Sequence, residues 1–373
     1  MKKISLIFSL MVAVLFATGI GAAFGAGAGI VAMGLSSLGA PSVSGFRMAI
    51  TPEIWTKEIV ENLWKNNEFM LKSIDESMYV VGGSVVHIPQ AGAASKAQRN
   101  RKLLPATITR RTDTDITYAL DEITTDPRFI PNIDEVELSY DKRQSCMLED
   151  QRSIDQLAAE AMIYNWKPKF YIKATGTAAA GNKVWGTGTR TGVTYSDFVA
   201  AKTIFNKWGI AKSGRYVMLD SDQYKQLCDD VKSHSSDNLT IVYNPTTGQL
   251  QKLEGFEIFE RNSVFLAETG VPLSAVTGTN YYEWTGGTDK LYTPEDYISI
   301  ELGEKSAATT ACVAGLFWSD TCVSRALGNK EMFEDKGNPT LYGDVYSFLL
   351  RVGGRARRED GKGVLGIIGV AGA

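Results

Sequence analysis

The sequence predicts a mixed α+β fold with about two compact units. The first observation is the length, because 373 residues with 44% hydrophobic side chains suffice for a sizeable core. The second is the 36 glycines with frequent Tyr, Phe and Trp, which favour strands and loops over a helical bundle. The third is a long amphipathic stretch at 145–166, which predicts a helix.

Residues 1–45 carry the pattern of a targeting or membrane segment. Two lysines at positions 2 and 3 precede an apolar stretch at 4–17 and small residues at 21–26, an order typical of a secretory signal. The apolar run continues to Val31 and is long enough for a membrane span. Three interpretations stay open: a signal or anchor, a removable arm of a shell protein, or sequence upstream of a true start at Met33 or Met48.

The next segment, 46–89, predicts one helix and two strands. Thr51 and Pro52 supply an N-cap and a first-turn proline, so a helix begins there. Residues 78–89 predict two short strands that meet at a Gly-Gly turn, the second ended by Pro89.

Residues 90–115 form a long excursion rich in Lys and Arg. An alternating run at 114–120 then predicts a half-buried strand, and two acidic groups follow it. We interpret the acidic groups as a solvated or partner-facing edge. The charged residues in question are Lys96, Arg99, Arg101, Lys102, Arg110 and Arg111, followed by Asp121, Glu122, Asp134, Glu135 and Glu137.

The amphipathic stretch at 145–166 repeats apolar residues every three or four positions and ends before Pro168. Residues 175–193 are rich in Gly, Ala and Thr and predict a hairpin or a mobile loop. A second unit begins at Thr194, which forms a capping box with Asp197. Its order of helix, strand and helix indicates an α/β unit. The predicted elements are a helix from 194 to Gly209, a helix at 221–231, and strands at 215–220, 256–259, 307–318 and 346–351.

Composition and motifs argue against an enzyme or a metalloprotein. The 39 basic and 42 acidic residues give a net charge of -3, so electrostatic contacts with a partner must be local. The sequence contains no nucleophile with a base, no metal-ligand pattern and no phosphate-binding loop, because the glycines at 286–287 lack the P-loop context. We therefore predict no catalytic residue and no cofactor. An arginine group allows contact with phosphate or with a neighbouring subunit: Arg351, Arg355, Arg357 and Arg358.

The cysteines lie far apart and form no C-x-x-C pair. We expect buried free thiols, with two disulfides only in an oxidising compartment. The four residues are Cys146, Cys228, Cys312 and Cys322.

Several stretches, together with the order of elements, resemble the tailed-bacteriophage and prophage major capsid proteins of the Hong Kong 97-type fold. The resemblance covers about residues 50–370 and rests on pattern and order, since no catalytic motif is involved. The stretches are Val86–Gln90, Leu104–Ala106, Arg111–Tyr118, Glu137–Lys142 and Arg357–Gly363.

The resemblance implies an N-terminal arm, an extended β-hairpin loop, a peripheral domain with a long spine helix, and an α/β axial domain. In this sequence the leader or arm would be 1–45, the N-terminal helix and start of the peripheral region 46–89, and the extended loop 90–115. The peripheral domain would be 116–193, with the spine helix at 145–166. The axial domain would be 194–318, and 319–373 would return to the peripheral domain.

The function that the resemblance implies is a structural coat protein that assembles into the icosahedral head shell around phage DNA. Its partners would be other copies in pentamers and hexamers, portal and scaffold proteins, and double-stranded DNA bound without sequence specificity. The subunits would assemble in the host cytoplasm and reside in the virion, with membrane contact only if the N-terminal segment is retained. A phage shell has no evident need for that segment as an export signal.

The charges predict how neighbouring subunits touch. We expect the basic loop to lie across an acidic surface of the next subunit, either the edge at 121–137 or the spine helix at Glu149 and Asp150. The resemblance also allows a crosslink from Lys96 or Lys102 to an asparagine of a neighbour. The alternatives are an exported bacterial surface or envelope protein, an encapsulin-like compartment shell and, third, a secreted hydrolase.

Overall fold

The computed structural model describes residues 67–80, 85–102, 104–105, 108–131, 142–178, 189–233, 243–244, 249–250, 252–262, 264–268, 273–284, 291–306, 311–338 and 340–369. The chain divides into two units, Met1–Trp55 and Thr56–Ala373, and all described residues belong to the second. Several predictions lie outside the described residues: the leader at 1–45, the helix from Thr51 and the acidic group Asp134, Glu135 and Glu137.

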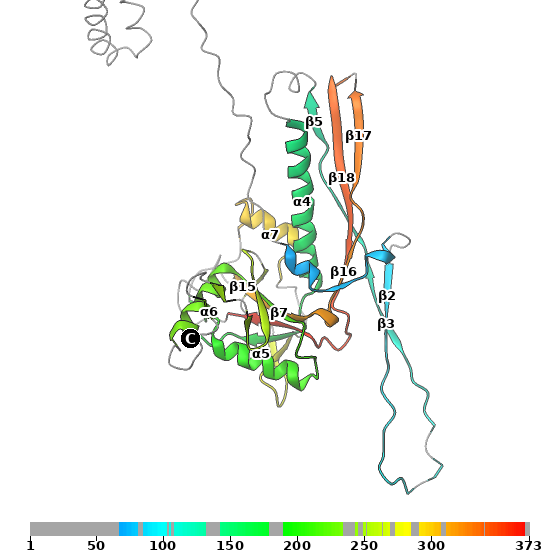
Figure 1. Cartoon of the computed structure of the whole chain (residues 1–373), viewed down its shortest axis with the longest axis vertical. Coiled ribbons are helices and arrows are strands. Elements are labelled where there is room, and N and C mark those ends of the chain that lie inside the picture. Colours follow the sequence, from blue (N-terminus) through cyan, green and yellow to red (C-terminus); the bar gives the residue numbers. More distant parts are fainter. Residues whose placement is uncertain are drawn as a thin grey trace, which may run out of the picture. The chain divides into compact units, whose positions relative to one another are not determined.

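A nine-stranded mixed sheet forms one body of the fold (Figure 1). Its strand order is β10-β11-β7-β15-β19-β6-β14-β13, with β12 paired to β15. β11 runs parallel to β7 and β19 parallel to β6, as the predicted α/β character requires. The strands are β6 (Phe170–Lys173), β7 (Arg215–Leu219), β10 (Lys252–Leu253), β11 (Phe256–Glu260), β12 (Phe265–Glu268), β13 (Leu273–Ala275), β14 (Tyr282–Trp284), β15 (Ala311–Ser319) and β19 (Val364–Ile368).

Helices cover both faces of this sheet. Along β7, Val217 and Leu219 belong to one hydrophobic cluster while Met218 between them belongs to another, as the alternation of side chains along a strand dictates. The first cluster includes residues of α5 (Tyr195–Lys207) and α6 (Ser221–Ser233). The second includes residues of α4 (Lys142–Asn165) and α7 (Pro294–Glu301). The sheet is therefore a central layer buried on both sides.

Local sequence signals explain where these helices begin and end. The N–H of Thr194 donates to the carboxylate of Asp197 at 2.9 Å, as expected of the predicted capping box. Gly209, with a φ of +74°, follows the last turn of α5, a conformation in which glycine meets no Cβ penalty. Thr293 accepts from the N–H of Asp296 ahead of Pro294, which starts α7.

A six-stranded sheet packs against α4, the predicted spine helix (Figure 1). Its longest strand, β18 (Gly343–Gly353), pairs with β4 (Asp121–Thr124) and β5 (Arg128–Pro131) on one side and with β16 (Ser324–Leu327) and β17 (Glu331–Asn338) on the other. β1 (Ile74–Asp75) extends it beside β16. Tyr346, Phe348, Leu350 and Val352 are buried in the same cluster as α4, so alternate residues of β18 form the core face.

Two smaller sheets complete the described strands. β2 (Val85–Gln90) and β3 (Thr114–Ala119) form a hairpin, and β8 (Tyr243–Asn244) pairs with β9 (Gln249–Leu250). A third hydrophobic cluster joins the hairpin to the body. Short 3₁₀ segments lie at η1 (Glu68–Leu71), η2 (Ser77–Tyr79) and η6 (Asp320–Cys322).

The structure corrects two local predictions. Residues 77–79 form η2 instead of a strand, because Tyr79 and Val80 donate back to the carbonyls of Glu76 and Ser77. Pro89 does not end its strand but pairs with Asp115 inside β2, which can accommodate proline because β2 has a described strand partner on one side alone. The acidic pair at 121–122, predicted as a solvated or partner-facing edge, is exposed at the start of strand β4.

The predicted domain divisions do not follow the sheets. β6 comes from the stretch assigned to the peripheral domain and β19 from the C-terminal return, yet both are inner strands of the nine-stranded sheet. The parallel pairing of β19 with β6 joins segments far apart in the sequence, so composition shifts along the chain do not reveal it.

Three of the four cysteines are free thiols: Cys146, Cys228 and Cys322. Cys228 and Cys322 are buried as predicted, and burial raises the pKa of both thiols. Cys146 is half-buried, and the side chain of Cys312 lies outside the described part of the chain.

Asp220 lies buried between β7 and α6, where its carboxylate accepts from the N–H of Asp222 at 3.1 Å. Burial raises its pKa to about 6. Between the ordinary carboxyl pKa of about 4 and this value, the folded chain holds a proton that the unfolded chain has lost. The free energy of unfolding therefore falls as pH rises through this window.

Asp220→Asn is expected to remove this slope and to raise the free energy of unfolding near neutral pH by about 1–3 kcal/mol, because the amide oxygen still accepts from Asp222. Denaturant unfolding at a series of pH values measures the difference from the parent chain. Asp229→Asn on the exposed face of α6 is the matched control, expected to change little. A parent-like pH slope in Asp220→Asn would contradict the burial argument.

Candidate assembly surfaces

The first candidate surface is the β2–β3 hairpin and the loop that it carries. Six residue pairs, from Val85↔Ala119 to Gln90↔Thr114, form an antiparallel ladder. Beyond them the described residues of the stretch 91–113 run on as a long loop that extends away from the two strands (Figure 1). Its neck is tight, because a Cβ on Gly92 would lie 2.0 Å from the carbonyl oxygen of Thr112. The predicted excursion is thus an extended β-hairpin loop.

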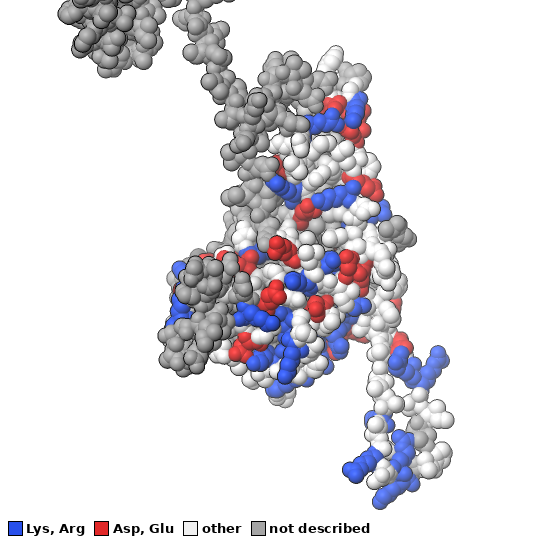
Figure 2. Space-filling view, in the orientation of Figure 1, with Lys and Arg blue, Asp and Glu red and all other residues white. Residues whose placement is uncertain are grey.

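Lysine and arginine side chains gather on this loop (Figure 2). Arg111 differs from the rest, because its guanidinium pairs with Asp113 through contacts of 2.6 and 2.9 Å. Within the described ranges, no ion pair involves the other five predicted residues, all of which are exposed: Lys96, Arg99, Arg101, Lys102 and Arg110. The loop therefore carries positive charge that its own subunit does not neutralise.

The loop also exposes apolar side chains. Leu104 is 78% exposed and Ile108 is 97% exposed, both among the basic residues. Large apolar side chains exposed this fully on a projecting segment indicate a surface that another molecule covers. In the sequence they are merely isolated apolar residues in a polar stretch.

The root of the hairpin is held by the C-terminal part of the chain. The amide of Gln90 donates to the carbonyl of Arg357 at 2.7 Å, and the hydroxyl of Thr114 donates to Glu359 at 2.9 Å. Arg355 donates to the carbonyl of Thr117 at 2.9 Å. These contacts tie both strands to one segment.

The predicted arginine group therefore finds partners inside its own chain. Arg351 pairs with Glu122 at 3.1 Å, and Arg358 binds Asp360 through two contacts of 2.9 and 2.7 Å. Arg355 holds the hairpin, and Arg357 lies 3.2 Å from a buried carboxylate, that of Glu76. Sequence reasoning missed these contacts because the partners lie far away in the chain.

The acidic candidates separate into different environments. Glu122 is exposed and already paired with Arg351, and Asp121 is exposed beside it on β4. Glu149 is half-buried on α4. Asp150 is 8% exposed and binds Arg128 at 2.9 Å, so one of its carboxylate oxygens has a partner within its own chain.

The six-stranded sheet carries a second surface, on its face away from α4. Phe129 lies opposite Val345, and Phe333 lies opposite Ser347, so these residues share one face while Tyr346 and Phe348 point to the core. Phe129 is 41% exposed and Phe333 is 54% exposed.

Acidic residues accompany these aromatic rings. Glu331 and Asp335 flank Phe333 at alternate positions of β17 and are exposed, so they share its face. We call this set the outer sheet face: Glu122, Phe129, Glu331, Phe333, Asp335, Val345 and Leu349. Arg351 lies opposite Glu122 on the same face and pairs with it, so the remaining acidic charge of the outer sheet face comes from Glu331 and Asp335.

Within the described ranges, no group of three or more His, Cys, Asp or Glu side chains is placed to hold a metal ion. None of the helices in those ranges is both long and apolar enough to cross a membrane.

Comparison with known proteins gives structural likeness without sequence likeness. No protein family profile matches the chain, and no curated protein sequence matches it. The capsid asymmetric unit of cyanophage Pam1 superposes with a TM-score of 0.58 at 12% identity, covering 89% of this chain and 100% of that one. The capsid of cyanophage P-SCSP1u gives 0.57 at 16% identity, covering 87% and 94%. A structure from Mycobacterium phage Che8 gives 0.56 at 15% identity, covering 85% and 97%.

These likenesses establish the fold. The chain has the α+β architecture of phage capsid subunits, and the predicted Hong Kong 97-type fold is confirmed. The long helix beside a narrow sheet, the extended hairpin and the helix-covered sheet appear together in one chain (Figure 1).

Proposed function

We propose that the chain is the major capsid protein of a tailed phage or prophage, a coat subunit whose copies assemble into an icosahedral head shell around double-stranded DNA. The observation that carries the proposal is the extended loop, which presents five unpaired basic residues and two exposed apolar ones on a capsid-type fold. A segment of this kind has no role in an isolated monomer. It has a role when another copy supplies the opposite charge and covers the apolar side chains.

The outer sheet face of a neighbouring copy is the surface that the loop fits. Glu331 and Asp335 are complementary to the loop cations, while Phe129 and Phe333 offer apolar contact to Leu104 and Ile108. Glu122 belongs to this surface and is paired with Arg351 of its own chain, while Asp121 alternates with it on β4 and stays a separate candidate for contact. Glu149, with Asp134, Glu135 and Glu137 outside the described residues, remains a further candidate for contact.

Small energies suffice for such a contact. An exposed ion pair contributes about 0.2–1 kcal/mol, and a covered apolar side chain adds about 1.5–3 kcal/mol when fully buried. Each copy gives one loop and receives another, so in a closed shell the contacts act together. Assembly then depends on repetition rather than on one strong site.

The further partners follow from the same proposal. Portal and scaffold proteins would meet the shell during assembly in the host cytoplasm, and packaged DNA would meet its inner face without sequence specificity. No catalytic residue or cofactor is needed for this role. A crosslink from Lys96 or Lys102 to a neighbour would appear as multimers in a mass spectrum of denatured particles.

Sedimentation of the purified full chain tests the proposal. A coat protein is expected to yield, besides free subunits, a fast-sedimenting fraction of uniform particles. A single slow peak over a wide range of concentration and ionic strength would overturn the proposal. Protein cargo in the particles with no nucleic acid would instead favour a cellular compartment shell.

A further inference from the structure

Residues 67–80 run between the long helix, the strand β16 and the hairpin root, and we call this segment the strap. Its start is held by Arg261, which donates to the side chain of Asn67 at 3.2 Å and stacks over Phe69 at 5.6 Å. Phe69 is buried edge-on against Trp166 of the segment after α4, with ring centroids 5.8 Å apart. The strap is thus seated on the core and is not a free connection.

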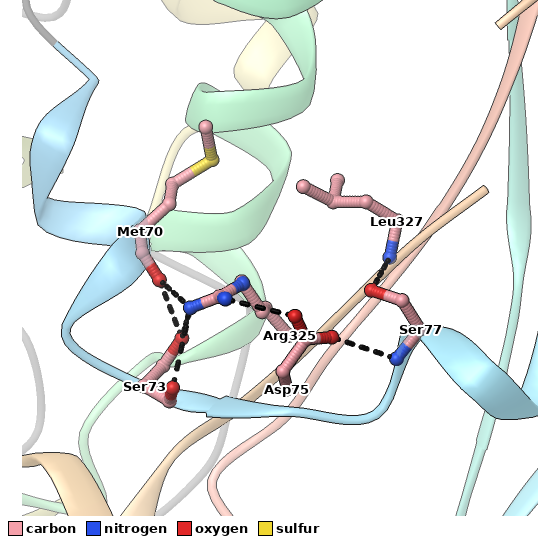
Figure 3. A network of polar contacts seen from close by, with 6 residues as sticks. All are labelled: Met70, Ser73, Asp75, Ser77, Arg325 and Leu327. Atoms are coloured by element: carbon pink, nitrogen blue, oxygen red, sulfur yellow. Dashed lines mark hydrogen bonds and ion pairs between the residues drawn. The ribbon is translucent and has the colours of Figure 1, made fainter. Parts of the chain in front are cut away.

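Arg325 holds the middle of the strap (Figure 3). Its guanidinium donates to the carbonyls of Met70 and Ser73 at 2.7 and 3.2 Å and to the carboxylate of Asp75 at 2.9 Å. A backbone hydrogen bond supports these contacts, since the N–H of Ile74 donates to the carbonyl of Val323 at 3.0 Å. One arginine therefore fixes three successive points of the strap to β16.

Glu76 connects the strap to the hairpin. It is 5% exposed, and its two carboxylate oxygens meet groups from two other segments. The hydroxyl of Tyr118 on β3 donates to one oxygen at 2.7 Å, and the guanidinium of Arg357 lies 3.2 Å from the other. Its own N–H donates to the carbonyl of Arg325 at 2.7 Å, so Glu76 directly follows the part of the strap that Arg325 binds.

The hairpin can move as a unit if this connection opens. Its six-pair ladder is internal, so the two strands stay paired without the body. Among the described residues, the other ties are the side-chain contacts of Gln90, Thr114 and Arg355, the contact of Tyr118 with Ser324, a small apolar cluster, and the one-residue connection through Leu120 to β4. Glu76 is the most buried of the charged groups among these contacts, and a buried carboxylate that loses a partner costs more free energy than an exposed one.

We propose that the strap is a latch whose Glu76 sets the direction in which the extended loop points. With Glu76 seated on Tyr118 and Arg357, the loop has one direction relative to the body. With Glu76 displaced, the folded hairpin swings while the two large sheets keep their structure. The inference concerns the single chain and does not require that the chain forms a shell.

Pulsed electron paramagnetic resonance on the full chain tests the latch. Spin labels on non-natural amino acids at positions 98, in the loop, and 212, on the body, report the distribution of loop directions. The doubly labelled chain is diluted into unlabelled chain so that only distances within one molecule are recorded. Glu76→Gln is expected to broaden the distribution at least about twofold, because the amide loses its charge-assisted contact with Arg357.

Glu295→Gln is the matched control, an identical change at an exposed residue of α7 that lies outside the strap and the hairpin. It is expected to leave the distribution narrow. Tyr118→Phe removes the same link from the hairpin side and is expected to broaden the distribution even if Glu76→Gln folds poorly. Narrow distributions in both Glu76→Gln and Tyr118→Phe, or equal broadening in Glu295→Gln, would overturn the latch.

Discussion

Replacing Arg99, Arg101 and Lys102 together by glutamate is expected to leave the chain folded and to reduce the yield of particles by at least about tenfold. All three side chains are exposed on the extended loop, away from the hydrophobic clusters, so the monomer loses no core contact. Each contact across the proposed interface changes from attraction to repulsion, and the small energies add over every copy. Circular dichroism reports the fold and sedimentation reports the particles.

Two further variants separate the contact from a general charge effect. Lys207, Lys212 and Lys225 are exposed on or beside α5 and α6, and their joint change to glutamate alters net charge equally. Since these residues lie on the other body of the fold, particles are expected to persist. Changing Glu331 and Asp335 to lysine in the loop variant is expected to restore part of the yield. Normal particles from the loop variant alone would refute the role of the loop.

Removing the carboxylate of Glu160 is expected to destabilise the fold more than any surface change. Glu160 of α4 binds Arg261, which follows β11, at 3.0 Å, and the two side chains are 3% and 1% exposed. Without its partner the guanidinium is a buried charge, so Glu160→Ala is expected to lower the free energy of unfolding by about 3–5 kcal/mol. Denaturant unfolding of the unassembled loop variant measures this without interference from particles.

The exposed pair between Glu122 and Arg351 supplies the control for this effect. Its atoms lie at a similar distance of 3.1 Å, but the side chains are 55% and 51% exposed. Glu122→Ala is therefore expected to cost at most about 1 kcal/mol. Equal losses from the two alanine variants would contradict the view that burial, and not pairing alone, fixes α4 against the nine-stranded sheet.

Elements with strong local patterns could be predicted from the sequence. The helix α4, the capping box at Thr194 and the strands β7 and β11 match their predicted positions to within a few residues. Each depends on side-chain periodicity or on a cap within a few residues, which the linear sequence displays. The strand order could not be predicted, because β6 and β19 pair across most of the second unit.

The candidate surfaces were likewise predictable only where they depend on local sequence. The basic loop is visible as composition, so its excess of positive charge was predictable. The outer sheet face was not predictable, because Phe129 and Phe333 become neighbours only through their separate pairings with β18. The pairing of Asp150 with Arg128 was not predictable for the same reason, since the two residues come from α4 and from strand β5.

The alternative of an exported envelope protein gains no support from the described residues. That interpretation expects paired cysteines, whereas Cys146, Cys228 and Cys322 are free thiols. The chain shares its fold with three solved phage structures that superpose on it with TM-scores above 0.5. The coat-protein proposal also gives the loop and the outer sheet face a common use.

Negative-stain electron microscopy of the purified full chain tests the central claim most directly. A major capsid protein is expected to show closed, rounded shells of uniform diameter, and the triple loop variant is expected to show none under the same conditions. Fields that contain only single subunits or irregular aggregates, at every concentration and ionic strength at which the chain is folded, would contradict the claim.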